Sequence, residues 1–81
     1  MSCTEEKRNP PTQQEIAAAM SEFTGGRHVD LVSQLSCVDY GKHRYLCEFA
    51  ISYIGLATQQ TEKCFFGAGS RWLVTESRHC E

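Results

Sequence analysis

The sequence predicts an α+β fold in which one N-terminal helix packs on an antiparallel meander of three or four strands. Two observations predict it. The spacing of apolar residues changes from about 3.6 to 2 near His28, and the segments after that point are separated by short turn-forming stretches. With 81 residues, 41% of them hydrophobic and 22% charged, the chain has the size and composition of one globular domain.

The domain is expected to span residues 12–77, between a mobile polar tail at 1–11 and a short C-terminal tail at 78–81. The first segment is polar and ends at Pro10-Pro11, where regular structure is predicted to begin. The four C-terminal residues, by contrast, follow the last segment with an apolar pattern.

A helix is predicted to begin after Thr12. Thr12 and Glu15 form a capping box, in which each side chain satisfies the backbone amide of the other residue. Gly25-Gly26 supplies the left-handed position that ends a helix. The stripe expected to face the core consists of Ile16, Ala19, Met20 and Phe23.

The next two segments predict a hairpin of half-buried strands. Asp39 and Gly41 provide turn chemistry between them. Apolar residues occupy the odd positions of both, namely Val29, Leu31, Leu35 and Cys37, then Tyr45, Cys47, Phe49, Ile51 and Tyr53, with Ser33 the one polar member. Matching the apolar faces predicts the register Cys37–Cys47, Leu35–Phe49, Ser33–Ile51 and Leu31–Tyr53.

The rest of the chain predicts a third strand within residues 57–66, after a turn at Ile54-Gly55. A helix over 57–64 is the alternative. Residues 67–70 read as a turn, and residues 71–76 as a fourth strand with Trp72 and Val74 on one face.

In outline, the chain resembles the small cystatin-like helix-plus-meander domains of bacterial and phage proteins. The resemblance covers residues 12–77: a leading helix, then a hairpin carrying a cysteine followed by Tyr-x-Cys-Glu at 45–48, then a strand with Arg-Trp-Leu-Val at 71–74. It implies the architecture alone and no site residue.

The five cysteines leave the role of Cys37 and Cys47 open between a disulfide and two buried thiols. Opposite residues of an antiparallel pair lie within the range that a disulfide spans, and free cysteine is also among the most buried residue types. No two cysteines have the close spacing of a structural zinc site, so neither a metal ion nor a cofactor is expected.

No catalytic residue is predicted, and the protein is expected not to be an enzyme. Cys37, Cys47 and Cys64 lie in apolar contexts, which raise a thiol pKa rather than activate the sulfur. The histidines, at positions 28, 43 and 79, are expected to be exposed. The glycines of residues 67–70 lack the lysine and the following helix of a phosphate-binding loop.

The charge of the chain bears on nucleic-acid binding, and its hydropathy bears on the cellular compartment. The net charge is −2 and the basic residues are scattered, so direct nucleic-acid binding is not favoured, and Lys42-His43-Arg44 is interpreted as a solvated turn. No stretch has the length and apolar character of a membrane span or signal peptide, which predicts a cytoplasmic protein. The alternative is a periplasmic or secreted domain whose export signal has been removed, with Cys3 as a lipid anchor.

The leading functional hypothesis is a small non-enzymatic binding domain, an inhibitor or adaptor that occludes a surface of a protein or nucleoprotein complex. By analogy of size and acidity, it would resemble phage or mobile-element inhibitors of host defence complexes. The alternatives are an exported domain stapled by Cys37–Cys47, and a thiol- or metal-dependent enzyme. A homodimer would also compensate for the small core. The partner-binding residues are predicted to be Asp30, Val38, Leu46, Glu48, Ile54 and Glu62.

Overall fold

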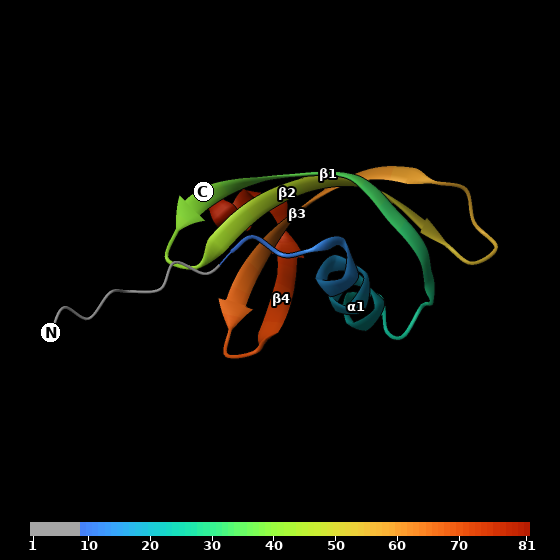
Figure 1. Ribbon diagram of the computed structural model, residues 1–81, viewed down its shortest axis with the longest axis horizontal. Coiled ribbons are helices and arrows are strands. Elements are labelled where there is room, and N and C mark those ends of the chain that lie inside the picture. Colours follow the sequence, from blue (N-terminus) through green and yellow to red (C-terminus); the bar gives the residue numbers. More distant parts are fainter. Residues whose placement is uncertain (1–8) are drawn as a thin grey trace, which may run out of the picture.

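The computed structural model describes residues 9–81 and shows one helix packed on a four-stranded antiparallel sheet (Figure 1). The strands follow one another in the order β1-β2-β3-β4, so the predicted α+β meander is confirmed and has four strands. The elements are α1 (Gln13–Phe23), β1 (Val29–Gly41), β2 (Arg44–Tyr53), β3 (Gln59–Ala68), β4 (Arg71–Glu76) and the 3-10 helix η1 (Ser77–Cys80).

Helix α1 begins as the capping box predicts. The Thr12 amide donates to Glu15 Oε1 at 2.9 Å, and the Glu15 amide donates to Thr12 Oγ1 at 3.2 Å. The helix buries Ile16, Ala19 and Met20 against the sheet. Phe23 differs from the prediction, because its side chain is 44% exposed and lies beneath Lys63 Nζ, 5.2 Å from the ring centroid.

The core lies between α1 and the concave, inner face of the sheet, which arches over the helix in Figure 1. Alternate residues of β2 point into this space, as predicted. Phe65 of β3 contacts Phe49 edge to face at 5.9 Å between centroids, and Trp72 of β4 contacts Tyr45 at 6.0 Å. Burial at the end of β2 raises the pKa of Tyr53, an effect partly offset by the nearby Arg27 guanidinium.

The predicted register of the hairpin is correct around Cys37–Cys47 and wrong further along β1. The structure pairs Val32 with Ile51 and Ser33 with Ala50, instead of Ser33 with Ile51. The cause is a β-bulge between Ser33 and Ser36, where Gln34 has a left-handed φ of 53°. A bulge adds one residue to one strand and reverses the alternation beyond it.

As a result, Val32 is buried where Leu31 was expected, and Leu31 is 60% exposed. A second irregularity between Val29 and Leu31 pairs Val29, rather than Leu31, with Tyr53. Val29 then returns to the inner face and packs against the core.

The C-terminal residues also differ from the prediction. Residues 77–80 form η1, and Cys80 is fully buried, so residues 78–81 are part of the domain rather than a tail. Residues 59–68 form a strand, which excludes the alternative helix over 57–64. Pro11, assigned to the N-terminal tail, is buried. The first eight residues of that tail lie outside the part of the chain that the structure describes.

Two disulfides link the strands and η1. Cys37 and Cys47 are bridged across the hairpin, with 4.0 Å between their Cα atoms. Cys64 of β3 is bridged to Cys80 of η1, with 5.4 Å between the Cα atoms, and this second bridge was not predicted. Cys3, which would be a lipid anchor under the alternative of an exported domain, lies outside the described residues.

Candidate protein-binding interface

The candidate interface is the outer face of the sheet, the side turned away from α1. Because side chains alternate along a strand, the even-numbered residues of β2 point to this side. The strand registers then place Val38 opposite Leu46, Leu46 opposite Cys64, and Glu48 opposite Glu62. This face carries much less cover than the inner one.

One end of the outer face carries four apolar side chains around Arg44, which lies opposite Phe66. We call this region the apolar patch. On it, Phe66 and Leu73 are cross-strand partners of β3 and β4, as Val38 and Leu46 are of β1 and β2. Val38 is 56% exposed and Leu73 is 49% exposed, while the other two are half-buried. The apolar patch consists of Val38, Leu46, Phe66 and Leu73.

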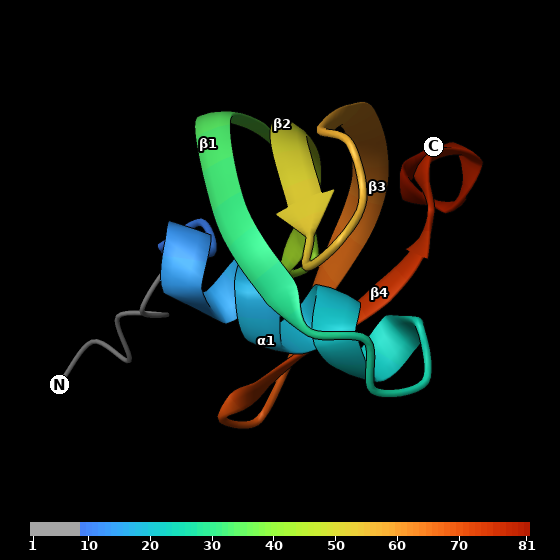
Figure 2. The same ribbon diagram turned by 90° about the vertical axis from the view of Figure 1, so that its right-hand side faces the viewer.

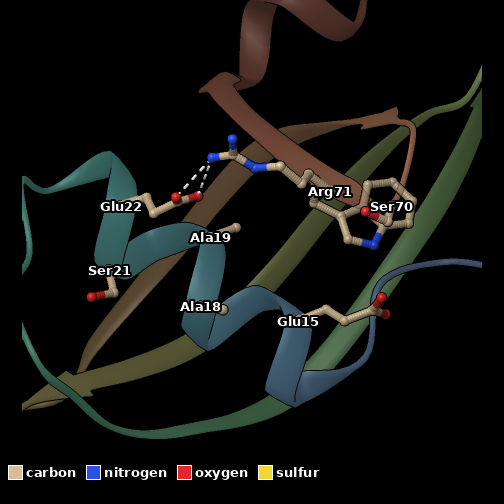
Figure 3. A pocket seen from close by; sticks show the side chains of 8 residues that line it. Glu15, Ala18, Ala19, Ser21, Glu22, Ser70 and Arg71 are labelled. Carbon is tan, nitrogen blue, oxygen red and sulfur yellow. Dashed lines mark hydrogen bonds and ion pairs between the residues drawn. The ribbon is translucent and has the colours of Figure 1, made fainter.

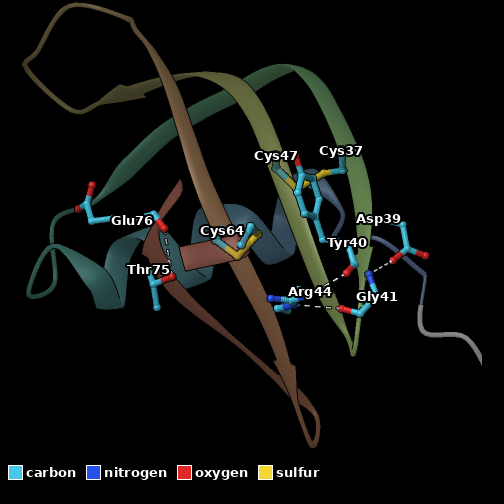
Figure 4. Close-up of a disulfide and its surroundings, with 10 residues drawn as sticks. Cys37, Asp39, Tyr40, Gly41, Arg44, Cys47, Cys64, Thr75 and Glu76 are labelled. Atoms are coloured by element: carbon cyan, nitrogen blue, oxygen red, sulfur yellow. Dashed lines mark hydrogen bonds between the residues drawn. A yellow bond between two sulfur atoms is a disulfide. The ribbon is translucent and has the colours of Figure 1, made fainter. Parts of the chain in front are cut away.

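Helix η1 lies next to the apolar patch. It is tied to the outer face by Cys64–Cys80, whose bridge is drawn at Cys64 in Figure 4. It contacts β2, β3 and β4. Figure 2 shows η1 well away from α1, beyond β3 and β4. The C-terminal segment therefore covers part of this face and leaves Val38 and Leu73 open to solvent.

The middle of the outer face is acidic. Glu48 and Glu62 face each other across β2 and β3, and both are exposed. Among residues 9–81, neither carboxylate forms an ion pair. Lys63, the neighbour of Glu62 in sequence, points to the inner side and binds Glu76 at 3.3 Å. Two like charges placed opposite one another repel.

A shallow hollow of about 240 Å³ lies at this acidic pair. It is lined by Glu48, Gln60, Thr61 and Glu62. Strand β4 ends at Glu76, opposite Lys63, so residues 59–62 of β3 are paired only with β2. The hollow therefore lies at an open part of the β3 edge.

The six predicted partner-binding residues fall into two groups. Val38, Leu46, Glu48 and Glu62 lie together on the outer face. Ile54 is 69% exposed, but it lies eight positions after Leu46 in the chain. Eight residues of an extended strand span about 26 Å. Asp30 lies at that same distant end, near the His28–Ile54 backbone hydrogen bond. The six residues therefore extend along most of the length of β2.

The sequence interpretation missed Phe66 and Leu73. Phe66 could have been found from the pattern of residues 64–66, where three successive apolar residues require that at least one points outward. Leu73 could have been found from the alternation of residues 71–76, which places it on the face opposite to Trp72 and Val74. The pattern of residues 64–66 had been interpreted as a core-like context for Cys64.

A second concavity lies between α1 and β4 (Figure 3). It has a volume of about 490 Å³ and is lined by residues that include Glu15, Glu22, Arg71 and Trp72. Glu22 and Arg71 form an ion pair across it at 2.7 Å, and both side chains are more than half exposed.

Within residues 9–81, no three His, Cys, Asp or Glu side chains are arranged to hold a metal ion. No helix in this range has the length and apolar character needed to cross a membrane. His28, His43 and His79 are exposed and lie on separate elements or turns.

Comparison with known proteins gave no relative: no protein-family model, no curated protein and no solved structure matches the chain. The fold and the outer face thus define a class, a small disulfide-linked α+β domain in which the helix covers one sheet face and a 3-10 helix covers part of the other.

Proposed function

We propose that the protein is a small non-enzymatic binding domain that covers a surface of a protein or nucleoprotein partner with its outer face. The apolar patch carries this proposal. Val38 and Leu73 are half exposed or more on a face that α1 does not cover, and apolar patches bordered by charge are typical of protein interfaces. The acidic pair of Glu48 and Glu62 supplies that border.

The mechanism would be steric occlusion by an inhibitor or adaptor. Four strands and a helix form a rigid base, so the sheet can cover a partner surface without refolding. Small acidic proteins of phages and mobile elements inhibit host defence complexes, and by analogy with their size and charge we propose such a complex as the partner.

We further propose that the domain works in an oxidising compartment, as an exported binding domain. Two bridges favour this over the cytoplasmic hypothesis, because disulfides are rare where glutathione keeps thiols reduced. The test is alkylation of the protein from its native source under non-reducing, denaturing conditions, followed by intact mass. We expect four of the five cysteines to resist labelling. Labelling of all five thiols would contradict the exported domain and favour the cytoplasmic hypothesis.

The binding surface is tested with a photo-crosslinking residue at Val38 and, as a matched control, at Ala18. Ala18 is exposed on α1, on the other side of the sheet. We expect crosslinked partner from position 38 and none from position 18. A crosslink between two copies of this chain would identify a homodimer as the occupant. Equal crosslinking from both positions would contradict the proposal.

Substitution of Leu46 tests the same surface by affinity. Leu46→Arg places a charge in the apolar patch and should weaken binding to the crosslinked partner at least about tenfold. Glu48→Arg should act in the same direction. The midpoint of denaturant unfolding serves as the control, since loss of the fold together with binding would count against an interface role.

A further inference from the structure

We infer that the disulfide between Cys37 and Cys47 is a redox switch, which a dithiol reductant opens selectively and which thereby controls binding through the apolar patch. The control of binding rests on the proposed function, whereas the selective opening of this disulfide does not. Binding then depends on the redox state of the compartment.

The two disulfides differ in their exposure to solvent. Cys37 is partly exposed, whereas the other three bridged cysteines, namely Cys47, Cys64 and Cys80, are 0% exposed. A thiolate reduces a disulfide by attacking one of its sulfur atoms, so the rate depends on access to that atom. In the folded domain, a reductant can therefore attack the Cys37–Cys47 bridge at Cys37, while both ends of the other bridge are covered.

The position of each bridge in the sheet accounts for this difference. Strand β1 is an edge strand that pairs with β2 alone, so Cys37 has no neighbouring strand on its other side. Cys64 lies on β3, between β2 and β4, and η1 contacts all three of these strands. Figure 4 shows Cys37 on β1 and Cys64 on β3. A thiol reaches Cys64–Cys80 only after η1 detaches from the sheet, and such local opening costs free energy.

The reduction consists of two thiol–disulfide exchanges. The reductant thiolate attacks Cys37 Sγ, a sulfur–sulfur bond forms between them, and the bond to Cys47 breaks. Cys47 Sγ leaves as a thiolate and takes a proton from water. The second thiol of the reductant then loses its proton, attacks the reductant's own sulfur in the mixed disulfide and releases Cys37 as a thiolate, which is protonated in turn. In total, the bridge gains two electrons and two protons, and the dithiol becomes a disulfide.

The bridge adjoins the pair of Val38 and Leu46 in the apolar patch. Val38 follows Cys37 and Leu46 precedes Cys47, so the two pairs are consecutive in the ladder of β1 with β2. Because consecutive residues of a strand point to opposite faces, the disulfide lies on the inner side, directly behind the patch. The disulfide thus fixes the backbone that presents Val38 on the outer face.

Once the bridge is open, few contacts hold the end of β1 in place. The bulge at Gln34 interrupts the ladder, and the segment 36–41 beyond it pairs only with β2. Near the turn, the Arg44 guanidinium donates two hydrogen bonds to backbone oxygens of this segment, at 3.1 and 3.2 Å. An edge segment of this kind opens locally at a lower free-energy cost than a strand inside the sheet. Val38 therefore loses its fixed position.

The rest of the domain depends less on this bridge. Within residues 9–81, the buried core cluster takes only Val32 from β1, and Val32 lies before the bulge. The bridge between Cys64 and Cys80 stays closed and keeps η1 on the sheet. Reduction therefore loosens one side of the apolar patch and leaves the core in place.

The test of selective opening uses the folded protein with both bridges formed, treated with dithiothreitol. Samples are transferred at intervals into a denaturing alkylating buffer, digested and mapped by mass. We expect Cys37 and Cys47 to become reduced at least about tenfold faster than the other two bridged cysteines. Equal rates, or earlier reduction of Cys64–Cys80, would overturn the inference.

The same reaction in a denaturing concentration of urea is the control. Both bridges are exposed in the unfolded chain, so the ratio of the two rates should fall to about one. A ratio that stays near its value in the folded protein would show that burial does not set the order of reduction. That result would also contradict the inference.

Control of binding is tested with the photo-crosslinking residue at Val38. The protein is reduced until its mass map shows Cys37–Cys47 open and Cys64–Cys80 closed. We expect its yield of crosslinked partner to be at least about fivefold lower than that of the oxidised protein. The matched control is Cys37→Ala/Cys47→Ala, whose low yield should be the same with and without dithiothreitol. A yield that still falls on reduction of this variant would trace the effect to the partner and overturn the switch.

Hydrogen exchange of the same reduced sample shows whether the opening is local. Exchange should rise in the segment 36–41 and stay unchanged in β3. A rise in both would mean that the whole domain unfolds on reduction, and the switch as inferred would be wrong.

Failure of this inference can be told apart from failure of the proposed function. If position 38 crosslinks the partner equally well in the oxidised and the reduced protein, the outer face remains the interface and redox control is wrong. If the oxidised protein gives no crosslink from position 38, the proposed function is wrong, and the control of binding is wrong with it.

Discussion

The two faces of the sheet have opposite characters although the same four strands build both. The centre of the inner face is covered by α1 and consists of buried apolar side chains. Within residues 9–81, the outer face has a single 3-10 turn as cover, an exposed apolar patch and two glutamates without an ion pair. Adjacent residues such as Phe65 and Phe66 therefore differ in role: Phe65 packs in the core, whereas Phe66 forms part of the apolar patch on the outer face.

The sharpest test of this comparison is truncation of these two phenylalanines. Phe65 is fully buried, so Phe65→Ala should cost about 3–5 kcal/mol of the free energy of unfolding. Phe66 is half-buried on the outer face, so Phe66→Ala should cost about 1 kcal/mol. Denaturant unfolding followed by tryptophan fluorescence measures both. Equal costs would show that the outer face is a second core.

Removal of each disulfide compares the hairpin with the outer face. The bridges close similar loops, with separations of 10 and 16 residues, so the chain-entropy model predicts a loss of about 3 kcal/mol for either double serine variant. The local effect should differ. Loss of Cys64–Cys80 should raise amide exchange in η1, while loss of Cys37–Cys47 should raise it in β1 and β2. Identical exchange patterns would mean that η1 does not depend on its bridge.

The smallest expected effect lies in the acidic pair. Glu62→Gln removes a cross-strand repulsion and should stabilise the domain by about 0.2–1 kcal/mol at low salt. The gain should disappear in about 1 M NaCl, where exposed charges are screened within about 3 Å. The urea midpoint at both salt concentrations provides the measurement. A gain that persists at high salt would have another cause.

The inner face was predictable from sequence because it follows strict periods. The capping box of Thr12 and Glu15 and the alternation of β2 need no tertiary information. The bulge at Gln34 was not predictable, since no glycine marks that position. It moved Leu31 to the surface and Val32 to the core.

The candidate site was predictable only in part. Matching the two cysteines of the hairpin placed Val38 beside Leu46, but the opposition of Glu48 and Glu62 depends on the register of β2 with β3, for which the sequence offers no such marker. The bridge from Cys64 to Cys80 depends on the chain crossing to the outer face after β4. Turns of that kind leave no periodic signal.

Gln34 gives β1 one amino acid more than its ladder with β2 requires. The pairs on either side, Ser33 with Ala50 and Ser36 with Glu48, span three steps on one strand and two on the other. A one-codon deletion at this position would leave Val32 and Leu35 on the inner face and remove the irregularity between Ser33 and Ser36. What the extra codon encodes is therefore curvature, because a bulge bends and twists its strand. The curvature of the outer face therefore depends on the number of residues in β1 and not on the hydrophobic pattern of the strand.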